Sequence, residues 1–280
     1  MTEQKKIKVS DILAMKKSGE KITMLTAYDV PFASFADKAG IEMILVGDSL
    51  ANVVLGLEST TQVGMIEMIH HAKAVTRAVK RAMVIGDMPY ESYQINPNES
   101  VNNARRFIEE AKCDAVKLEW FDKCIEVTKQ IVNARIPVMG HIGLTPQTAD
   151  QLGGFKVQGR NAEAAKRLIQ QAKDLEKVGC FSIVFECIPD KIAEMITNEL
   201  SIPTIGIGAG LECDGQVLVL HDVLGLFEKF RPKFVKQYKN LAKESIEAMV
   251  AFKEEVKSRK FPTKEHSFTI KNEELEKIGK

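Results

Sequence analysis

The sequence predicts a single (β/α)₈ barrel, and three observations support this prediction. Short apolar runs alternate with longer amphipathic segments, a pattern typical of βα units on a parallel sheet. Most of these runs are continuously apolar rather than alternating, as expected for strands that are covered on both faces. The length of 280 residues suits one barrel, since such domains typically need about 250 residues.

The predicted strands are the runs in which β-branched and other apolar residues concentrate, and there are about eight of them, the number that closes such a barrel. They cover residues 22–28, 42–48, 82–87, 115–119, 137–142, 181–186, 203–207 and 217–221. The predicted helices cover residues 33–39, 65–79, 100–112, 161–178, 190–200 and, as the outer helix after the eighth strand, 239–257.

Other features define the two ends and one long loop. Ser10 is a suitable N-cap and Gly19 a suitable stop, so we predict a helix over residues 10–19 that closes the lower mouth of the barrel. We find no low-complexity linker and therefore predict one domain over residues 1–280, with a frayed tail over 271–280. Residues 144–160 form a long polar loop of a kind that is often functional.

The composition argues against several classes of function. Lys and Arg number 39 and Asp and Glu 38, so there is no basic surface for nucleic acid or an anionic membrane. The N-terminus has no apolar stretch typical of a signal peptide, and no apolar run is long enough to cross a bilayer. The five cysteines are scattered, which argues against a disulfide framework. We expect a cytoplasmic protein whose partners are small molecules and copies of itself.

Titratable side chains collect where the predicted strands end, which is where barrel enzymes carry their catalytic groups. They are Asp48, Asp87, Lys117, Glu119, His141 and Glu186, on the second to the sixth strand. Taken singly, each has a plain structural explanation: Asp48 or Asp87 could cap a helix, and Lys117 could pair with a carboxylate. Three acids on one rim would be costly together, since a buried unpaired carboxylate costs several kcal/mol. A divalent cation would remove that cost.

The three acids suggest which cation and which reaction. Asp48, Asp87 and Glu119 are hard oxygen ligands, which suit Mg²⁺. A 2-oxo acid can chelate Mg²⁺ through its keto and carboxylate oxygens, and the metal then acidifies the neighbouring C–H. Glu186 is the candidate base for that proton. Lys117 and His141 would hold the substrate oxygens and stabilise the enolate.

A glycine-rich segment, IGIGAG over residues 205–210, ends the seventh predicted strand. Glycines at this place in a barrel can form a phosphate cradle, since loops after the seventh and eighth strands often bind phosphate. They can equally leave room for a cofactor ring, or serve only the conformation of the backbone. The sequence leaves these alternatives open.

Several strings of residues carry a resemblance to a known family. They are TAYD (26–29), VGDS (46–49), GHIGLTPQ (140–147), GGFKVQGR (153–160), GIGAG (206–210) and EHSF (265–268). Together, and in this order, they closely resemble ketopantoate hydroxymethyltransferase from about residue 10 to residue 268. The resemblance implies a barrel of the phosphoenolpyruvate/pyruvate-binding superfamily type, one Mg²⁺ per subunit and 5,10-methylenetetrahydrofolate as co-substrate.

The implied reaction adds a hydroxymethyl group to 3-methyl-2-oxobutanoate and gives 2-dehydropantoate, on the route to pantothenate and coenzyme A. By match to the family's motifs, Asp48, Asp87 and Glu119 resemble the metal ligands and Glu186 the proton acceptor. The residues that resemble the substrate-binding set are Asp48, Ser49, Asp87, Lys117 and His141. Members of the family usually assemble as decamers of two pentameric rings.

One departure and two alternatives accompany this hypothesis. The family typically has two glycines after the metal-site glutamate, whereas this chain has Trp120 and Phe121 after Glu119. The first alternative is an oxo-acid lyase or mutase on the same type of barrel, but such enzymes commonly carry a reactive cysteine in the loop after the fifth strand, and residues 144–160 contain none. The second is a binding or scaffold protein, in which protein cations would neutralise the acids.

Overall fold

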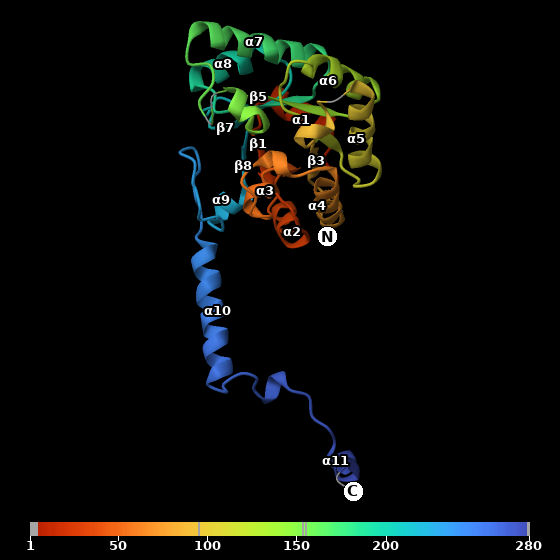
Figure 1. Cartoon of the computed structure of the whole chain (residues 1–280), viewed down its shortest axis with the longest axis vertical. Helices are drawn as coiled ribbons and strands as arrows, with labels where there is room; N and C mark the ends of the chain where they lie inside the picture. Colours follow the sequence, from red (N-terminus) through yellow and green to blue (C-terminus); the bar gives the residue numbers. More distant parts are fainter. Residues whose placement is uncertain (1–4, 95, 153, 155, 279–280) are drawn as a thin grey trace.

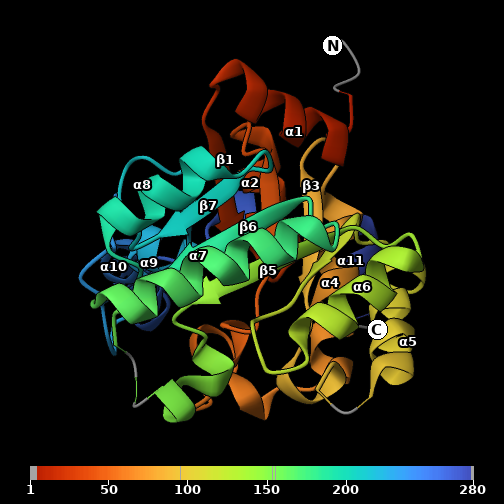
Figure 2. The ribbon, with the colours of Figure 1, turned by 90° about the horizontal axis from the view of Figure 1, so that it is seen from above.

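The strands form a closed parallel barrel in which neighbours along the chain are neighbours in the sheet, with β8 pairing back to β1. Figure 2 shows part of this barrel, with β5, β6 and β7 side by side. This computed structural model describes residues 5–94, 96–152, 154 and 156–278. The strands are β1 (Ile22–Thr26), β2 (Met43–Val46), β3 (Met83–Asp87), β4 (Ala115–Lys117), β5 (Val138–Gly143), β6 (Ser182–Glu186), β7 (Thr204–Ile207) and β8 (Gly215–Leu218). The predicted fold class is confirmed.

One strand begins and ends earlier than predicted. β8 starts at Gly215 rather than at residue 217, and His221 belongs to the helix that follows. A Cβ at Gly215 would lie 2.4 Å from the carbonyl oxygen of Ile22, so this strand needs a glycine to approach β1. An isolated glycine gives no strand signal in the sequence, which explains the shift.

The helices follow the strands as βα units require. They are α1 (Val9–Ser18), α2 (Val30–Lys38), α3 (Leu50–Val53), α4 (Met65–Ala78), α5 (Pro97–Glu109), α6 (Cys124–Asn133), α7 (Ala162–Lys177), α8 (Asp190–Glu199), α9 (Leu220–Leu224), α10 (Leu241–Lys257) and α11 (Asn272–Ile278). Short 3₁₀ segments lie at Thr60–Gln62 (η1), Tyr90–Ser92 (η2), Pro146–Leu152 (η3) and Lys264–His266 (η4). α3, α6, α9 and α11 were not among the predicted helices.

Packing against the barrel explains α6, whose sequence is rich in β-branched residues with modest helix propensity. Its buried residues, Cys124, Val127, Thr128 and Ile131, have the i, i+3, i+4, i+7 spacing of one helix face. Burial of that face therefore outweighs the weak local preference.

The N-terminal helix α1 closes the barrel at the end opposite to the carboxylates. Ile12 is fully buried and belongs to the apolar cluster inside the barrel, together with Met24, Met43 and Met83. Gly19 ends α1 in the left-handed conformation, as predicted. The predicted N-cap is wrong, because α1 begins at Val9: the Asp11 carboxylate accepts the backbone N–H of Lys8 at 2.8 Å, so Lys8 is the capping position.

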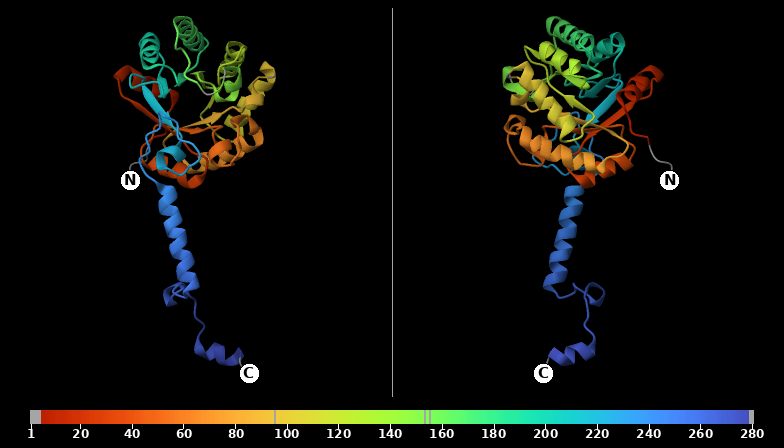
Figure 3. Two further views of the ribbon diagram at one scale, coloured as in Figure 1. Left: turned by 60° about the vertical axis from the view of Figure 1, so that its left-hand side comes forward. Right: turned by 90° about the vertical axis from the view of Figure 1, so that its right-hand side faces the viewer.

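The C-terminal helix α10 stands away from its own barrel (Figures 1 and 3). The predicted helix is present, but its prediction as an outer helix packed on the barrel is wrong, since only Ala242 in it is buried. Its exposed large apolar residues are Ile246, Met249, Val250, Phe252 and Val256. Residues of the predicted tail form α11, none of which is buried.

No helix in the described part of the chain is both long enough and apolar enough to span a membrane.

Candidate functional site

The predicted site residues meet at the carboxyl ends of β2 to β6. Asp87 and Lys117 end β3 and β4 and are directly paired in the sheet register. Their side chains form a buried ion pair, with 2.7 Å between Lys117 Nζ and Asp87 Oδ1. This ion pair therefore holds the carboxyl ends of β3 and β4 together on one side of the site.

His141, on β5, lies between the cation of Lys117 and two carboxylates. Its Nδ1 is 3.4 Å from Lys117 Nζ and 3.5 Å from Glu119 Oε1, and its Nε2 is 3.3 Å from Glu186 Oε2. Burial and Lys117 lower the pKa of His141, but the neighbouring carboxylates of Glu119 and Glu186 outweigh them and raise it to about 9. The two carboxylates therefore favour the protonated form of this imidazole.

Asp48 follows β2 and faces the same mouth. Its backbone N–H donates to Asp87 Oδ2 at 3.1 Å, and its own Oδ2 accepts from Gln147 Nε2 at 2.9 Å. Burial and the charge of Glu119 raise the pKa of Asp48 to about 6, although Lys117 opposes the shift. Its surroundings thus disfavour the ionised form of Asp48, and a cation bound beside it would favour that form.

Ser49 and Glu186 occupy opposite sides of this mouth. Ser49 is the residue before α3, and its Oγ lies 2.8 Å from the hydroxyl of Tyr28. Glu186 ends β6 and retains a side-chain exposure of 16 %, against 1 % for Glu119. Glu186 is therefore the carboxylate of this group that an incoming molecule can reach most easily.

A glycine on β5 allows the approach of β6 at this point. Gly143 has φ +99°, and a Cβ added there would lie 2.2 Å from the carbonyl oxygen of Glu186. The close contact between the two backbones depends on the missing side chain. Gly143 thus contributes to the position of Glu186.

The carboxylates have the properties of a cation site. The Oδ1 atom of Asp87 is buried, and its partner is Lys117 Nζ at 2.7 Å. Burial also raises the pKa of Asp87 to about 6, with Lys117 opposing and Asp48 adding to the shift. Burial thus disfavours the ionised forms of Asp48 and Asp87, and together with Glu119 they supply the oxygen donors that a hard divalent ion prefers, so Asp48, Asp87 and Glu119 fit Mg²⁺.

The side chains are not, however, arranged as a closed ligand shell. Within the described ranges, no three His, Cys, Asp or Glu side chains converge tightly enough to hold a metal ion by themselves. Lys117 and the amide of Gln147 lie against the carboxylates instead. Occupation by Mg²⁺ would therefore require small adjustments of these side chains.

Sequence reasoning missed Gln147, which contacts two of the three carboxylates. Its backbone N–H donates to Glu119 Oε2 at 3.0 Å, and its side chain donates to Asp48. A neutral amide has no titratable group and lies in the predicted loop rather than at a strand end. The only signal was its place in the string GHIGLTPQ.

The two aromatic residues after Glu119 do not enter the carboxylate cluster. The backbone N–H of Trp120 donates to the carbonyl of His141 at 2.9 Å, which holds the β4 end against β5. The ring of Phe121 packs edge-on against Tyr93, with 5.3 Å between ring centres. Glu119 itself remains buried at the barrel mouth.

Close packing explains the glycines after β7. Gly208 and Gly210 have φ +64° and +86°, and added Cβ atoms would lie 2.9 Å from Phe234 and 2.6 Å from Asp190 Cβ. These contacts favour the conformational explanation over a phosphate cradle. Of the string GGFKVQGR, Gly153 and Phe155 lie outside the described residues.

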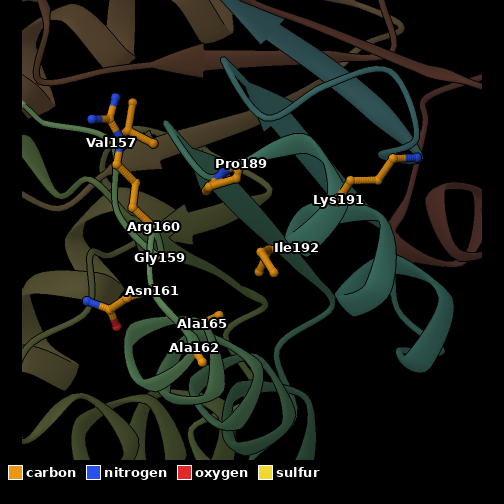
Figure 4. Close-up of a pocket in the computed structure, with 9 residues that line it drawn as sticks. All are labelled: Val157, Gly159, Arg160, Asn161, Ala162, Ala165, Pro189, Lys191 and Ile192. Atoms are coloured by element: carbon orange, nitrogen blue, oxygen red, sulfur yellow. The ribbon is translucent and has the colours of Figure 1, made fainter.

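A separate surface depression of about 600 Å³ lies between the end of the 144–160 loop and α8 (Figure 4). Its lining includes Val157, Arg160, Pro189 and Lys191. None of the carboxylates of the barrel mouth lines it, so it is distinct from the candidate active site.

Solved structures similar to this chain share its barrel. A phosphonopyruvate hydrolase in complex with oxalate and Mg²⁺ matches with a TM-score of 0.58 and 13% identity, covering 93% of each chain. A 2,3-dimethylmalate lyase of the PEP mutase/isocitrate lyase superfamily matches with a TM-score of 0.59 and 13% identity, covering 97% of this chain and 94% of the lyase. At this identity the likeness extends to the fold alone.

Sequence relatives are much closer. The 3-methyl-2-oxobutanoate hydroxymethyltransferase of Syntrophomonas wolfei is 54% identical over 273 residues, which are 98% of this chain and 99% of that protein. The enzyme of the same name from Moorella thermoacetica is 53% identical over 268 residues, 96% of this chain and 100% of that protein. The family model for ketopantoate hydroxymethyltransferase matches residues 6–264. The chain therefore belongs to the ketopantoate hydroxymethyltransferase family of enzymes.

Proposed function

We propose that this enzyme transfers a hydroxymethyl group from 5,10-methylenetetrahydrofolate to 3-methyl-2-oxobutanoate and forms 2-dehydropantoate, in pantothenate and coenzyme A biosynthesis. The names of the relatives support the acceptor and the transferred group. The observation that carries the proposal is the cluster of Asp48, Asp87 and Glu119 at the barrel mouth, with Glu186 joined to it through His141.

The acceptor molecule, 3-methyl-2-oxobutanoate, must be bound through its carboxylate and its keto group. Lys117 and the protonated His141 provide positive charge for the carboxylate and the keto oxygen. The Ser49 hydroxyl, oriented by Tyr28, can donate a further hydrogen bond. Asp48, Asp87 and Glu119 would hold Mg²⁺, one ion per subunit, which when bound withdraws charge from the keto group and lowers the pKa of the C3 proton.

Glu186 accepts the C3 proton in this proposal. Its carboxylate is partly accessible, and His141 Nε2 at 3.3 Å orients it. Loss of the proton makes C3 nucleophilic. Water hydrolyses the methylene group of the folate, which breaks both of its C–N bonds and releases tetrahydrofolate and a carbon at the oxidation level of formaldehyde. C3 forms a bond to that carbon, and its oxygen takes up a proton and becomes the hydroxyl of the product. The positive charges of Lys117 and His141 stabilise the enolate oxygen while that bond forms.

The two alternatives make different demands on these residues. A lyase or mutase of the kind considered above would use a cysteine after β5, whereas the residues between Gly143 and α7 include none. A scaffold protein would pair its acids with protein cations. Lys117 pairs with Asp87, and His141 lies 3.5 Å from Glu119. Among the described residues, however, the side chain of Asp48 is hydrogen-bonded to the neutral amide of Gln147. This difference favours a bound divalent ion.

We also propose that the protein is a homo-oligomer, a decamer by its family resemblance. The row of exposed apolar residues on α10, which includes Met249 and Phe252, supports association through this helix, since such surface is rarely left in water. The five free cysteines support a location in a reducing cytoplasm.

The proposed activity is tested by incubating the purified protein with 3-methyl-2-oxobutanoate, 5,10-methylenetetrahydrofolate and Mg²⁺. Formation of 2-dehydropantoate, measured by mass spectrometry, is the expected result. A protein that releases no such product, but cleaves or rearranges the oxo acid, would be an enzyme of the alternative class.

A further inference from the structure

The contacts of Gln147 connect the carboxylate cluster with three loops of the barrel mouth. Its side-chain nitrogen donates to Asp48 Oδ2 at 2.9 Å and to the carbonyl oxygen of Met88 at 3.2 Å. Its backbone N–H donates to Glu119 Oε2 at 3.0 Å. One residue after β5 therefore spans the distance between a carboxylate that follows β2 and a carboxylate that follows β4.

The orientation of the Gln147 amide is set by Tyr93. The Tyr93 hydroxyl donates a hydrogen bond to the Gln147 side-chain oxygen. Burial raises the pKa of Tyr93 well above its usual value, so the phenol remains a donor. With its oxygen engaged by Tyr93 and both N–H groups engaged by Asp48 and Met88, the amide has no free polar atom and cannot turn its oxygen toward the carboxylates.

Phe121 in turn holds the ring of Tyr93. The two rings pack edge to face, with 5.3 Å between centres and an angle of 68°. Tyr93 is fully buried, and Phe121 follows Glu119 by two residues. Phe121 is thus joined to Glu119 by the chain, and through Tyr93 and Gln147 by three successive contacts.

We propose that Gln147, oriented by Tyr93 and Phe121, is a positioning residue that sets the spacing of Asp48 and Glu119 for the divalent cation. Gln147 touches neither the cation nor the substrate in this proposal; it acts through the two carboxylates. The proposal rests on the metal site of the proposed function. It also gives a role to Phe121, one of the two aromatics that depart from the family's pattern.

The test is calorimetric titration of the purified full-length enzyme with Mg²⁺, comparing the wild type with Tyr93→Phe and Gln147→Leu. A neutral hydrogen bond contributes modestly, so Tyr93→Phe is expected to weaken Mg²⁺ binding by roughly three- to tenfold. Gln147→Leu removes the side-chain donor of Asp48, while the backbone N–H that donates to Glu119 remains, and it is expected to weaken binding by more than about tenfold. Exposed Tyr238→Phe and Gln170→Leu are the matched controls and should bind as the wild type does.

A second readout separates positioning from general damage. For Tyr93→Phe, the Mg²⁺ concentration that gives half-maximal activity should rise by the same factor, while kcat at saturating Mg²⁺ should stay within about twofold of the wild type. Wild-type Mg²⁺ affinity in both variants would overturn the proposal, as would a fall in kcat without a change in Mg²⁺ requirement. If the wild type itself bound no Mg²⁺, the metal site of the proposed function would fail and this inference with it.

Discussion

The backbone N–H of Asp48 donates to the side chain of Asp87 over 3.1 Å, and this hydrogen bond joins the ends of β2 and β3 where two buried acids meet. Burial raises the pKa of both carboxylates to about 6. Burial therefore disfavours the ionised form of each acid, and a cation between them would favour it.

Substitution of either acid should abolish Mg²⁺ binding. Asp48→Asn and Asp87→Asn each remove a charged ligand, and Asp87→Asn also leaves Lys117 without its partner, so it should destabilise the fold by about 3 kcal/mol. Mg²⁺ titration and thermal unfolding measure the two effects. Asp174→Asn, on the outer helix α7, is the control. Unchanged Mg²⁺ affinity in both variants would remove these residues from the ligand set.

Glu186→Gln should abolish proton removal while leaving substrate binding largely intact. The amide is the same size as the carboxylate but is not a base, and loss of a general base costs roughly 10²–10⁴-fold in rate. Deuterium uptake at C3 of 3-methyl-2-oxobutanoate, followed by NMR without folate, reports this step alone. Exposed Glu163→Gln should exchange at the wild-type rate. Exchange by Glu186→Gln as fast as by the wild type would refute the assignment of the base.

The effect of Mg²⁺ on stability should grow with pH. In the metal-free protein Asp48 and Asp87 have a pKa of about 6, above the value of roughly 3.9 expected for the unfolded chain. The stability that their protonated forms provide is complete below the unfolded value and is lost as pH rises through about 6. Mg²⁺ binds the deprotonated carboxylates. The rise in the Tm of the protein on addition of Mg²⁺ should therefore be larger at about pH 7.5 than at about pH 5. An equal rise in Tm at both pH values would contradict the expected coupling between Mg²⁺ binding and deprotonation of Asp48 and Asp87.

Gly143→Ala should displace Glu186. The new methyl group would lie 2.2 Å from the backbone of Glu186 and would also occupy φ +99°. We expect a loss of more than about 2 kcal/mol in the free energy of unfolding, with slower C3 exchange. Gly19→Ala is the control, because Gly19 has positive φ but open space around it, and it should lose only about 1 kcal/mol. Two variants with equal losses would mean that the close contact has no effect.

Charges on α10 should break the proposed oligomer. The double variant Met249→Glu, Phe252→Glu adds charge to the apolar face of a helix that does not pack on its own barrel (Figure 3). Light scattering after size-exclusion chromatography should show a lower molar mass, whereas Glu255→Gln, at an exposed position on the other face of α10, should not change it. An unchanged mass would place the interface elsewhere.

The sequence predicted the barrel well because strand and helix periods are local signals. It also predicted which titratable residues meet, because parallel strands bring their carboxyl ends to one rim; Asp87 and Lys117 are an example. It failed for α6 and for the position of α10, since both depend on packing between distant segments. Gln147 was missed for the same reason: its contacts with Asp48 and Glu119 cross 99 and 28 residues of chain.

The central claim is that carboxylates from separate strands hold one divalent cation. A crystal of the enzyme soaked with Mn²⁺, measured for anomalous scattering, tests this claim directly. We predict a single strong peak at the barrel mouth, within bonding distance of Asp48 and Asp87. A peak elsewhere, or none at full Mn²⁺ saturation, would contradict the account.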